Sequence, residues 1–356
     1  MTHPEFSHIE PYSDQQVPEA IARIVADPQL PALIHMVNPY VDPAQAIALI
    51  AQVRTTEQFH HRVLLPLLLG VLKHSATGFS FGGYQHLDPR KRYLFVSNHR
   101  DIFLDAALFN YALARMGFDI TENAVGDNLM PTPLFRDLAL SSGMFPITRG
   151  GTRREMFQAS LLVSQYIRYA ITEKGKSVWI AQRNGRTKDG NDRTEPGLLK
   201  MFSMSGSKDF VENLSQLNIV PVAISYEHEP CADRKVRELR IKHMEGQYVK
   251  APGEDTASII QGIHDRKGHI HIAFCQPIAL DELSLCAQVT GDEGLNAPFT
   301  ALAALIDRRI HDGYRLFPFS IEAYELLKAQ SKEIDLGSEP DLMLHLYAAP
   351  VENKNT

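Results

Sequence analysis

Cysteine is scarce in this sequence, and the three cysteines that it holds stand far apart. Cys231, Cys275 and Cys286 form no C-x-x-C pair in a chain of 356 residues. Disulfide frameworks and thiolate zinc sites depend on several cysteines at regular, short spacings. The pattern therefore argues against both kinds of cross-link and fits a protein that works in a reducing compartment.

Long hydrophobic runs are also missing. The longest, VLLPLLLGVL at residues 63–72, is about half as long as a membrane-spanning helix, and Pro66 and Gly70 interrupt it. We interpret it as a core helix or, as the alternative, as a segment that dips partly into a membrane interface. The first residues, MTHPEFSHIEPYSDQQ, lack the basic and apolar segments of a secretory signal. We expect a cytoplasmic protein that can work at the inner face of the membrane.

Basic residues are not in excess either. Lysine and arginine number 36 against 42 aspartates and glutamates, and the formal net charge is -6. Surfaces that bind nucleic acid are typically basic, so we expect no nucleic-acid partner and only a local anion site. The GGTRR stretch at 150–154 lacks the spacing of a P-loop, and no G-x-S-x-G motif is present. These absences argue against nucleotide hydrolysis and against a common serine esterase.

Histidines do not gather into a metal-binding pattern. His60 and His61 are adjacent on an expected helix and therefore point in different directions. No Asp or Cys stands nearby to complete a ligand set, so we expect no metal site. His269 and His271 lie on one face of an expected strand, where a polar sheet surface explains them equally well.

What the sequence does contain is a helical region followed by alternating strand-like and helical segments. Apolar residues recur at helical spacing up to residue 76, and the alternation begins at about residue 77. The strand-like runs are 93–98, 120–126, 144–147, 177–182, 218–226, 236–242 and 269–278, and the helical segments lie at 102–116, 133–142, 153–173, 256–264 and 299–312.

This alternation predicts an α/β fold with a mixed, mostly parallel sheet covered by helices and an N-terminal helical appendage. We expect three regions along the chain: an N-terminal helical region over 1–76, an α/β domain over 77–330, and a C-terminal helix and tail over 331–356. The last six residues, VENKNT, are expected to be a frayed tail.

A histidine between a strand and a helix is the first candidate for chemistry. The stretch SNHRDIFLD at 97–105 follows the expected strand, with Asp101 suited to cap the next helix and Asp105 one turn inside it. A carboxylate that holds His99 would let the ring take a proton from an alcohol. A capping aspartate beside a solvated histidine explains the pattern of His99 and Asp101 equally well.

Two basic, glycine-bearing loops follow expected strands further along the chain. They are GMFPITRGG at 143–151 and RNGRTKDGNDR at 183–193. Arginine side chains and backbone N–H groups in such loops suit a phosphate or a carboxylate. Taken alone, Arg149 and Arg186 are better explained by charge pairing at the surface.

Taken in order, these stretches resemble the glycerolipid acyltransferase superfamily, which contains glycerol-3-phosphate and lysophosphatidate acyltransferases. The resemblance covers roughly residues 92–278. SNHRDIFLD resembles the N-H-x-[ST]-x-x-D block, GMFPITRGG the G-x-x-F-[IV]-x-R block, IAQRNGRTKDG the F-P-E-G-T-R-S block, IVPVAIS the [IV]-P-V-x-[IV] strand, and IHIAFCQPI the strand with G-x-P-I. RNGRTKDGNDRT, SNHRDIFLDAALF and IDRRIHDGYRLFPFSIEAY are similar to a divergent bacterial branch of phospholipid acyltransferases.

The resemblance implies an O-acyltransferase that forms no covalent enzyme intermediate. His99 would be the general base, with Asp105 or Asp101 as its partner. Phosphate binding would fall to Arg149, Gly185 and Arg186, with Arg183, Asn184, Lys188 and Arg193 as further candidates around them. The acceptor would be glycerol phosphate or a lysophospholipid, and the acyl donor would be acyl-CoA or acyl carrier protein as co-substrate, without a cofactor. Contact with the membrane would be peripheral.

Two departures from the family pattern motivate an alternative. Five residues separate His99 from Asp105, where the family has four, and Asn184 stands in place of a glutamate. Asn184 supplies no charge. The alternative is therefore a catalytically altered relative that binds lipid or acyl donor without transferring the acyl group.

Overall fold

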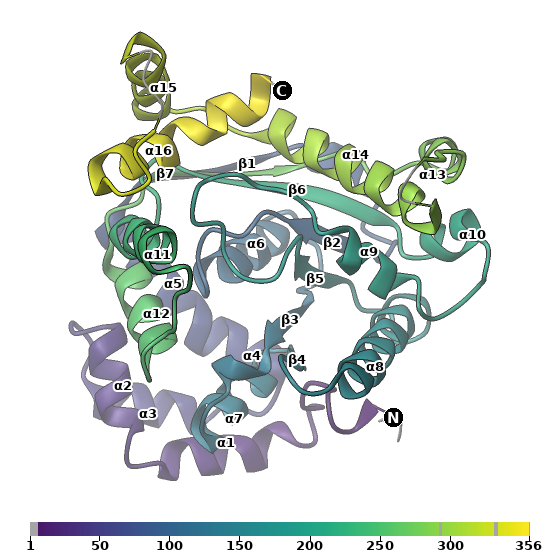
Figure 1. The fold of residues 1–356 in the computed structure, drawn as a ribbon. Helices are drawn as coiled ribbons and strands as arrows, with labels where there is room; N and C mark the ends of the chain where they lie inside the picture. Colours follow the sequence, from purple (N-terminus) through teal and green to yellow (C-terminus); the bar gives the residue numbers. More distant parts are fainter. Residues whose placement is uncertain (1–5, 292–293, 331–333, 356) are drawn as a thin grey trace.

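A computed structural model describes residues 6–291, 294–330 and 334–355. Its centre is a seven-stranded sheet with the strand order β1-β7-β6-β2-β5-β3-β4 (Figure 1). Neighbouring strands are parallel, except that β6 and β7 are antiparallel. The expected α/β fold with a mixed, mostly parallel sheet is confirmed. The strands are β1 (Ala76–Gly82), β2 (Leu94–Ser97), β3 (Glu122–Gly126), β4 (Met144–Ile147), β5 (Val178–Ala181), β6 (Ile219–Tyr226) and β7 (Gly268–Phe274).

Short helices precede the sheet, as expected for the N-terminal appendage. Apolar side chains from residues 12–64 form a cluster of their own, which also includes Leu134 from a helix of the α/β part, whereas those of residues 67–72 pack with the helix over residues 104–115. The appendage therefore packs onto the rest of the molecule (Figure 1). Its elements are α1 (Val17–Ala26), α2 (Leu30–Val37), α3 (Pro43–Ile50), α4 (Thr56–Phe59), the π-helical η2 (His60–Leu64) and α5 (Leu65–Ser75).

The remaining helices alternate with the strands and extend beyond the last one. In the described part of the chain, none of the helices combines the length and the apolar character that crossing a membrane requires. The helices are α6 (Leu104–Arg115), α7 (Pro133–Ser141), α8 (Arg153–Thr172), α9 (Pro196–Phe202), α10 (Phe210–Ser215), α11 (Ala232–Glu245), α12 (Glu254–His264), α13 (Leu280–Ala287), α14 (Ala297–Gly313), α15 (Pro318–Gln330) and α16 (Glu339–Asn355), with 3₁₀ turns η3 (Tyr84–His86), η4 (Asp127–Leu129) and η5 (Gly294–Asn296).

Helices cover both faces of the central strands. Successive side chains of a strand point to opposite faces, so Leu94 and Val96 of β2 join a buried cluster with α8, α9 and α14. Phe95 joins a second cluster with α5 and α6. All residues of β2 and β6 are buried, which explains why the sequence shows them as nearly continuous apolar runs.

The prediction of a strand at 236–242 is wrong, because this segment lies within α11. Ala232, Val236 and Leu239 are spaced for one face of a helix and pack against Leu342 and Leu346 of α16. The short apolar run can be interpreted with either periodicity, and the packing partner lies about a hundred residues away in sequence.

Two other expectations also require correction. The alternation did not predict β1, whose Gly78, Ser80 and Gly82 interrupt the hydrophobic pattern of an edge strand that pairs with β7. The expected frayed tail is helical up to Asn355. Asn353 donates a hydrogen bond from Nδ2 to the carbonyl of Gly190 at 2.9 Å, which fixes the end of α16 against the loop at 183–193.

Candidate active site

The corner between β2 and α6, residues 97–105, is fixed to the neighbouring strand. Asn98 accepts a hydrogen bond from the backbone N–H of Ile224 at 2.8 Å and donates one to the carbonyl of Ile224 at 3.0 Å. Its side chain thereby continues the pairing of β2 with β6 beyond Ser97. His99 follows at once, so its backbone is held at the carboxyl end of a central strand. We call residues 97–105 the His99 corner.

His99 and Asp105 form a hydrogen-bonded pair. The distance between His99 Nδ1 and Asp105 Oδ2 is 2.9 Å, and the side chains are 14% and 0% exposed. The same carboxylate oxygen accepts the backbone N–H groups of Arg100 at 2.6 Å and Asp101 at 3.0 Å. The structure thus places Asp105 against the imidazole, although five residues separate the two in sequence.

The environment of Asp105 keeps this carboxylate ionised. Burial opposes ionisation, but the hydrogen bond and charge of His99 and the backbone N–H groups of Asp101 and Arg100 outweigh it and lower the pKa of Asp105. Tyr226, at the end of β6, donates its hydroxyl to Asp105 Oδ1 at 2.8 Å. Burial and the charge of Asp105 raise the pKa of Tyr226, so its hydroxyl remains a donor.

Asp101 has a different place from Asp105. Its Oδ1 accepts the backbone N–H groups of Phe103 at 2.9 Å and Leu104 at 2.7 Å, which caps the start of α6. Its Oδ2 is buried without a hydrogen-bond partner among the described residues. Burial and the charge of Asp105 raise the pKa of Asp101. Of the two aspartates left open by the sequence, Asp101 caps the helix and Asp105 holds the imidazole.

The contact with Asp105 decides which nitrogen of His99 can act on a substrate. Nδ1 faces the carboxylate and therefore carries the proton in the neutral ring, which leaves the lone pair on Nε2. The edge of Trp179 lies beside the ring, with centroids 6.1 Å apart. This arrangement suits a general base that accepts a proton at Nε2.

Residues 183–193, which follow β5 and which we call the anion loop, lie directly beside the His99 corner. The backbone N–H of Thr187 donates to the carbonyl of His99 at 3.0 Å. Gly185 has a φ of +79°, a conformation that favours glycine. Arg186 is 7% exposed, and its Nη1 is buried without a hydrogen-bond partner in the described part of the chain. A buried guanidinium with a free donor is a candidate anion-binding group.

Arg149 lies at the same edge of the sheet as Arg186. His99, Arg186, Gly126 and Arg149 follow the carboxyl ends of β2, β5, β3 and β4, which are consecutive and parallel in the sheet. Arg149 is exposed, and its side chain lies so close over Gly126 that an added Cβ there would stand 2.5 Å from Arg149 Nε. Its backbone N–H donates to Asp127 Oδ1 at 3.1 Å.

The other predicted residues of the anion loop have varied surroundings. Lys188 forms an ion pair with Glu238 at 2.6 Å, and Arg193 donates to Asn191 Oδ1 at 3.2 Å. Asn184 is exposed. Arg183 has a buried Nε without a partner among the described residues. Lys188 is therefore already neutralised by a carboxylate outside the loop.

Sequence reasoning missed several residues that surround the corner. Tyr226 and Trp179 contact the His99–Asp105 pair, and Arg100 and Asp192 form a buried ion pair at 2.6 Å between the corner and the anion loop. Position beside a predicted strand end was an available signal for Tyr226. Nothing in the sequence pattern pairs Arg100 with Asp192, which lies 92 residues away.

A cavity of about 590 Å³ lies along α6, and His99 does not line it. Phe103, Ala106 and Tyr111 line it from the corner and α6, and Leu64 and Leu68 line it from the appendage. Phe103 connects this cavity to the His99 corner. In the described residues, no three His, Cys, Asp or Glu side chains come together as a metal site.

One comparison with known proteins covers four of the five motif blocks. Residues 78–225 match the family model described as Acyltransferase. The crystal structure of the 1-acyl-sn-glycerophosphate (LPA) acyltransferase PlsC from Thermotoga maritima aligns with a TM-score of 0.40 and 10% identity over 83% of this chain and 95% of that chain. A likeness this distant adds nothing to what the sheet already shows. No curated protein matches.

The matched residues include the His99 corner, Arg149 and the whole anion loop. Residues 78–225, which carry these candidate residues, are therefore similar to an acyltransferase domain.

Proposed function

We propose that this protein transfers a fatty acyl group from the thioester of acyl-CoA or acyl carrier protein to a hydroxyl of glycerol phosphate or lysophosphatidate. The observation that supports this most is the His99–Asp105 pair, at 2.9 Å, on the same sheet edge as Arg186, whose Nη1 has no hydrogen-bond partner among the described residues. A base and an anion-binding group side by side suit a substrate that has both a hydroxyl and a phosphate.

In this mechanism His99 acts as the general base. Nε2 removes the proton of the acceptor hydroxyl as its oxygen attacks the thioester carbonyl, and the C–S bond then breaks. The departing thiolate takes the proton from His99, so the enzyme returns to its starting state. Asp105 holds the tautomer and stabilises the imidazolium that forms. General-base help typically contributes about 10²- to 10⁴-fold, so positioning of the two substrates must supply much of the remainder.

Arg186 and Arg149 hold the phosphate of the acceptor. A planar guanidinium fork matches phosphate oxygens better than an ammonium does. Nη1 of Arg186 is a hydrogen-bond donor that has no partner among the described residues. Arg149 follows β4, which lies two strands away from β5 in the sheet. Gly185, without a side chain, leaves its backbone N–H open to the same anion.

The appendage and the cavity suit a lipid substrate. Met36, Tyr40, Val41 and Leu69 are exposed apolar side chains, with Tyr40 at 76%. Tyr40 stacks on His74, with ring centroids 4.7 Å apart, so the loop after α2 lies against α5. We propose that this surface contacts the membrane peripherally from the cytoplasmic side. The cavity along α6 would receive apolar parts of a substrate.

The alternative, an altered relative that binds without transferring, is favoured by one observation. Asn184 is exposed and uncharged where the resemblance implies a glutamate. The longer spacing between His99 and Asp105 no longer favours it, because the two side chains are hydrogen bonded all the same.

The test is an assay of purified protein with acyl-CoA and acyl carrier protein donors. Acceptors are glycerol 3-phosphate, lysophosphatidate and an unphosphorylated monoacylglycerol, and mass spectrometry detects the acylated product. We expect product from a phosphorylated acceptor. Removing the charge in Arg149→Gln should raise the KM for that acceptor more than the KM for the thioester. The proposal is wrong if no donor and acceptor pair yields product.

A further inference from the structure

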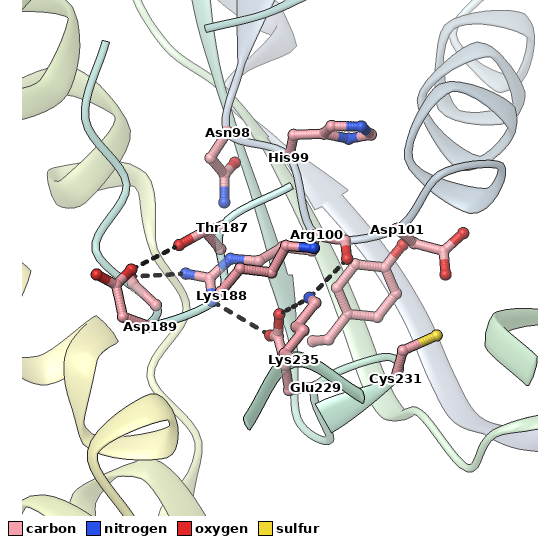
Figure 2. A network of polar contacts seen from close by, with 12 residues as sticks. Asn98, His99, Arg100, Asp101, Thr187, Lys188, Asp189, Glu229, Cys231 and Lys235 are labelled. Atoms are coloured by element: carbon pink, nitrogen blue, oxygen red, sulfur yellow. Dashed lines mark hydrogen bonds and ion pairs between the residues drawn. The ribbon is translucent and has the colours of Figure 1, made fainter. Parts of the chain in front are cut away.

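Arg100, next to His99 in the sequence, has no role in the mechanism above, yet it is only 3% exposed. Figure 2 shows that the side chains of His99 and Arg100 leave the corner in different directions. Arg100 donates from Nη2 to Asp192 at 2.6 Å and from Nη1 to Glu229 at 3.2 Å. A buried arginine with two carboxylates needs an explanation beyond surface charge.

Asp192 is the point at which the anion loop meets the corner. It is fully buried, and its Oδ2 accepts from Arg100 and, at 3.0 Å, from Nδ2 of Asn98. The hydroxyl of Tyr314 donates to the same oxygen. Asn98 and Arg100 are the two residues that flank His99. One carboxylate of the anion loop therefore holds both neighbours of the proposed base.

Lys235 of α11 also belongs to this network. Its ammonium donates to the carbonyl of Arg100 at 2.7 Å and forms an ion pair with Glu229 (Figure 2). Two buried cations, Arg100 and Lys235, thus face two buried carboxylates, Asp192 and Glu229. Buried ion networks of this kind contribute little net stability compared with apolar packing, but they can specify one geometry.

The anion loop is attached to the corner at Thr187, Gly190 and Asp192, with Arg186 beside the first of these residues. The backbone of Thr187, one residue after Arg186, is bonded to His99, and Asp192 closes the loop five residues later. Asn184 is uncharged. Asp192 is the carboxylate of this loop that lies buried against the corner. The network therefore sets the distance between the anion-binding guanidinium and the base.

We propose that Arg100 and Asp192 are positioning residues, which hold Arg186 and the phosphate of the acceptor in register with His99. This inference rests on the proposed function. Catalysis depends steeply on such placement, since a misplacement of about 1 Å can cost about 10²-fold. Asp192→Asn keeps the shape of the side chain but removes the charge that Arg100 binds.

The experiment compares Asp192→Asn with Glu282→Gln, which removes the acid of a partly buried ion pair with Arg309, between α13 and α14. For Asp192→Asn we expect kcat/KM to fall about 10- to 100-fold, with a raised KM for the phosphorylated acceptor, a thioester KM within about twofold and an unchanged pH profile. Glu282→Gln should behave as wild type. A variant that is merely less stable would lose active protein and keep its KM.

Binding of glycerol 3-phosphate without donor, measured by calorimetry, separates this inference from the proposed function. If the wild type binds the phosphate but transfers no acyl group, the proposed function fails and a weaker Kd for Asp192→Asn still supports the network. If Asp192→Asn changes only the melting temperature, or if the wild type does not bind, the inference is wrong. If Asp192→Asn does not fold, the same measurements on Arg100→Lys test the inference. This substitution keeps the positive charge but removes the planar guanidinium fork.

Discussion

At the scale of single residues, two aspartates four positions apart have separate tasks. The corner turns so that Asp105 meets the imidazole while Asp101 caps the helix. Both are buried, yet the pKa of Asp105 is lowered and that of Asp101 is raised. The difference arises because Asp105 accepts hydrogen bonds from His99, from two backbone N–H groups and from the hydroxyl of Tyr226. One oxygen of Asp101, by contrast, has no hydrogen-bond partner among the described residues.

Exchanging these two carboxylates for amides should therefore have unequal effects. Asp105→Asn removes the charge that fixes the tautomer and stabilises the imidazolium, so we expect kcat to fall by about 10²-fold or more. Asp101→Asn keeps a capping oxygen, and we expect less than about a tenfold loss. Steady-state kinetics with a single donor and acceptor pair decide between them. Equal losses in both variants would contradict the assignment of Asp105.

At the scale of elements, the paired strands β1 and β7 contain a titratable cluster that lies apart from the His99 corner. Ser80 of β1 is hydrogen bonded to His269 and His271 of β7, each at 2.8 Å, and Arg315 donates to Ser80 at 3.2 Å. Burial, with the charges of Arg315 and His269, lowers the pKa of His271 to about 4. The pairing of β1 with β7 thus includes a histidine that stays neutral at mildly acidic pH.

This shift predicts a loss of stability in acid. Between pH 6.5 and about 4 the unfolded chain binds a proton at His271 that the folded chain does not, so the free energy of unfolding falls as the pH falls. The effect should be on the order of 1 kcal/mol, because solvent screens a half-buried ring. Chemical denaturation across this range should show a shallower pH dependence in His271→Gln. Parallel curves for both proteins would contradict the prediction.

The exposed apolar side chains of the appendage give a prediction for the membrane. Replacing Tyr40 and Leu69 by serine removes apolar area from the proposed contact surface, so binding to phosphatidylglycerol-containing vesicles should weaken about 10-fold or more. Leu326→Ser is the matched control, because Leu326 is 54% exposed on α15, at the other end of the molecule (Figure 1). Sedimentation with vesicles measures the difference. Equal weakening by the control would contradict this surface.

At the scale of the whole molecule, the appendage and the α/β part are joined by a specific contact. Arg23 of α1 holds Asp137 of α7 with two hydrogen bonds of 2.8 Å, and Tyr12 donates to the same carboxylate at 2.6 Å. Burial raises the pKa of Asp137, but the hydrogen bonds of Arg23 and Tyr12, together with the charges of Arg23 and Arg136, outweigh it and leave this pKa lowered. The division at residue 76 stays a prediction, because the cluster of the appendage includes Leu134 of α7.

Removing Arg23 should therefore weaken the entire fold. Arg23→Ala leaves Asp137, which is 5% exposed, with less compensation for its charge. We expect the free energy of unfolding to fall by about 1–2 kcal/mol, less than for a fully buried pair because Arg23 is half-exposed. Calorimetry should show one transition that moves to lower temperature. A separate early transition of the appendage would show that it unfolds alone.

Much of this fold could be predicted because its central strands are short apolar runs between helical patterns. β2, β5 and β6 were predictable for that reason, and so was the corner that follows β2. The exceptions depend on distant contacts. The helix at 232–245 is decided by packing on α16, and the pairing of Arg100 with Asp192 exists only once β2 and β5 are neighbours. Asp101 and Asp105 could not be separated in sequence, since only the turn of the corner decides which reaches His99.

The most direct test of the account is acceptor-dependent thiol release in His99→Ala. His243→Ala, an exposed histidine of α11, is the control. If His99 is the general base, wild type and control release thiol from an acyl thioester only when a phosphorylated acceptor is present, and the rate of release by His99→Ala falls by about 10²- to 10⁴-fold. Release at the wild-type rate by His99→Ala would contradict this role of His99.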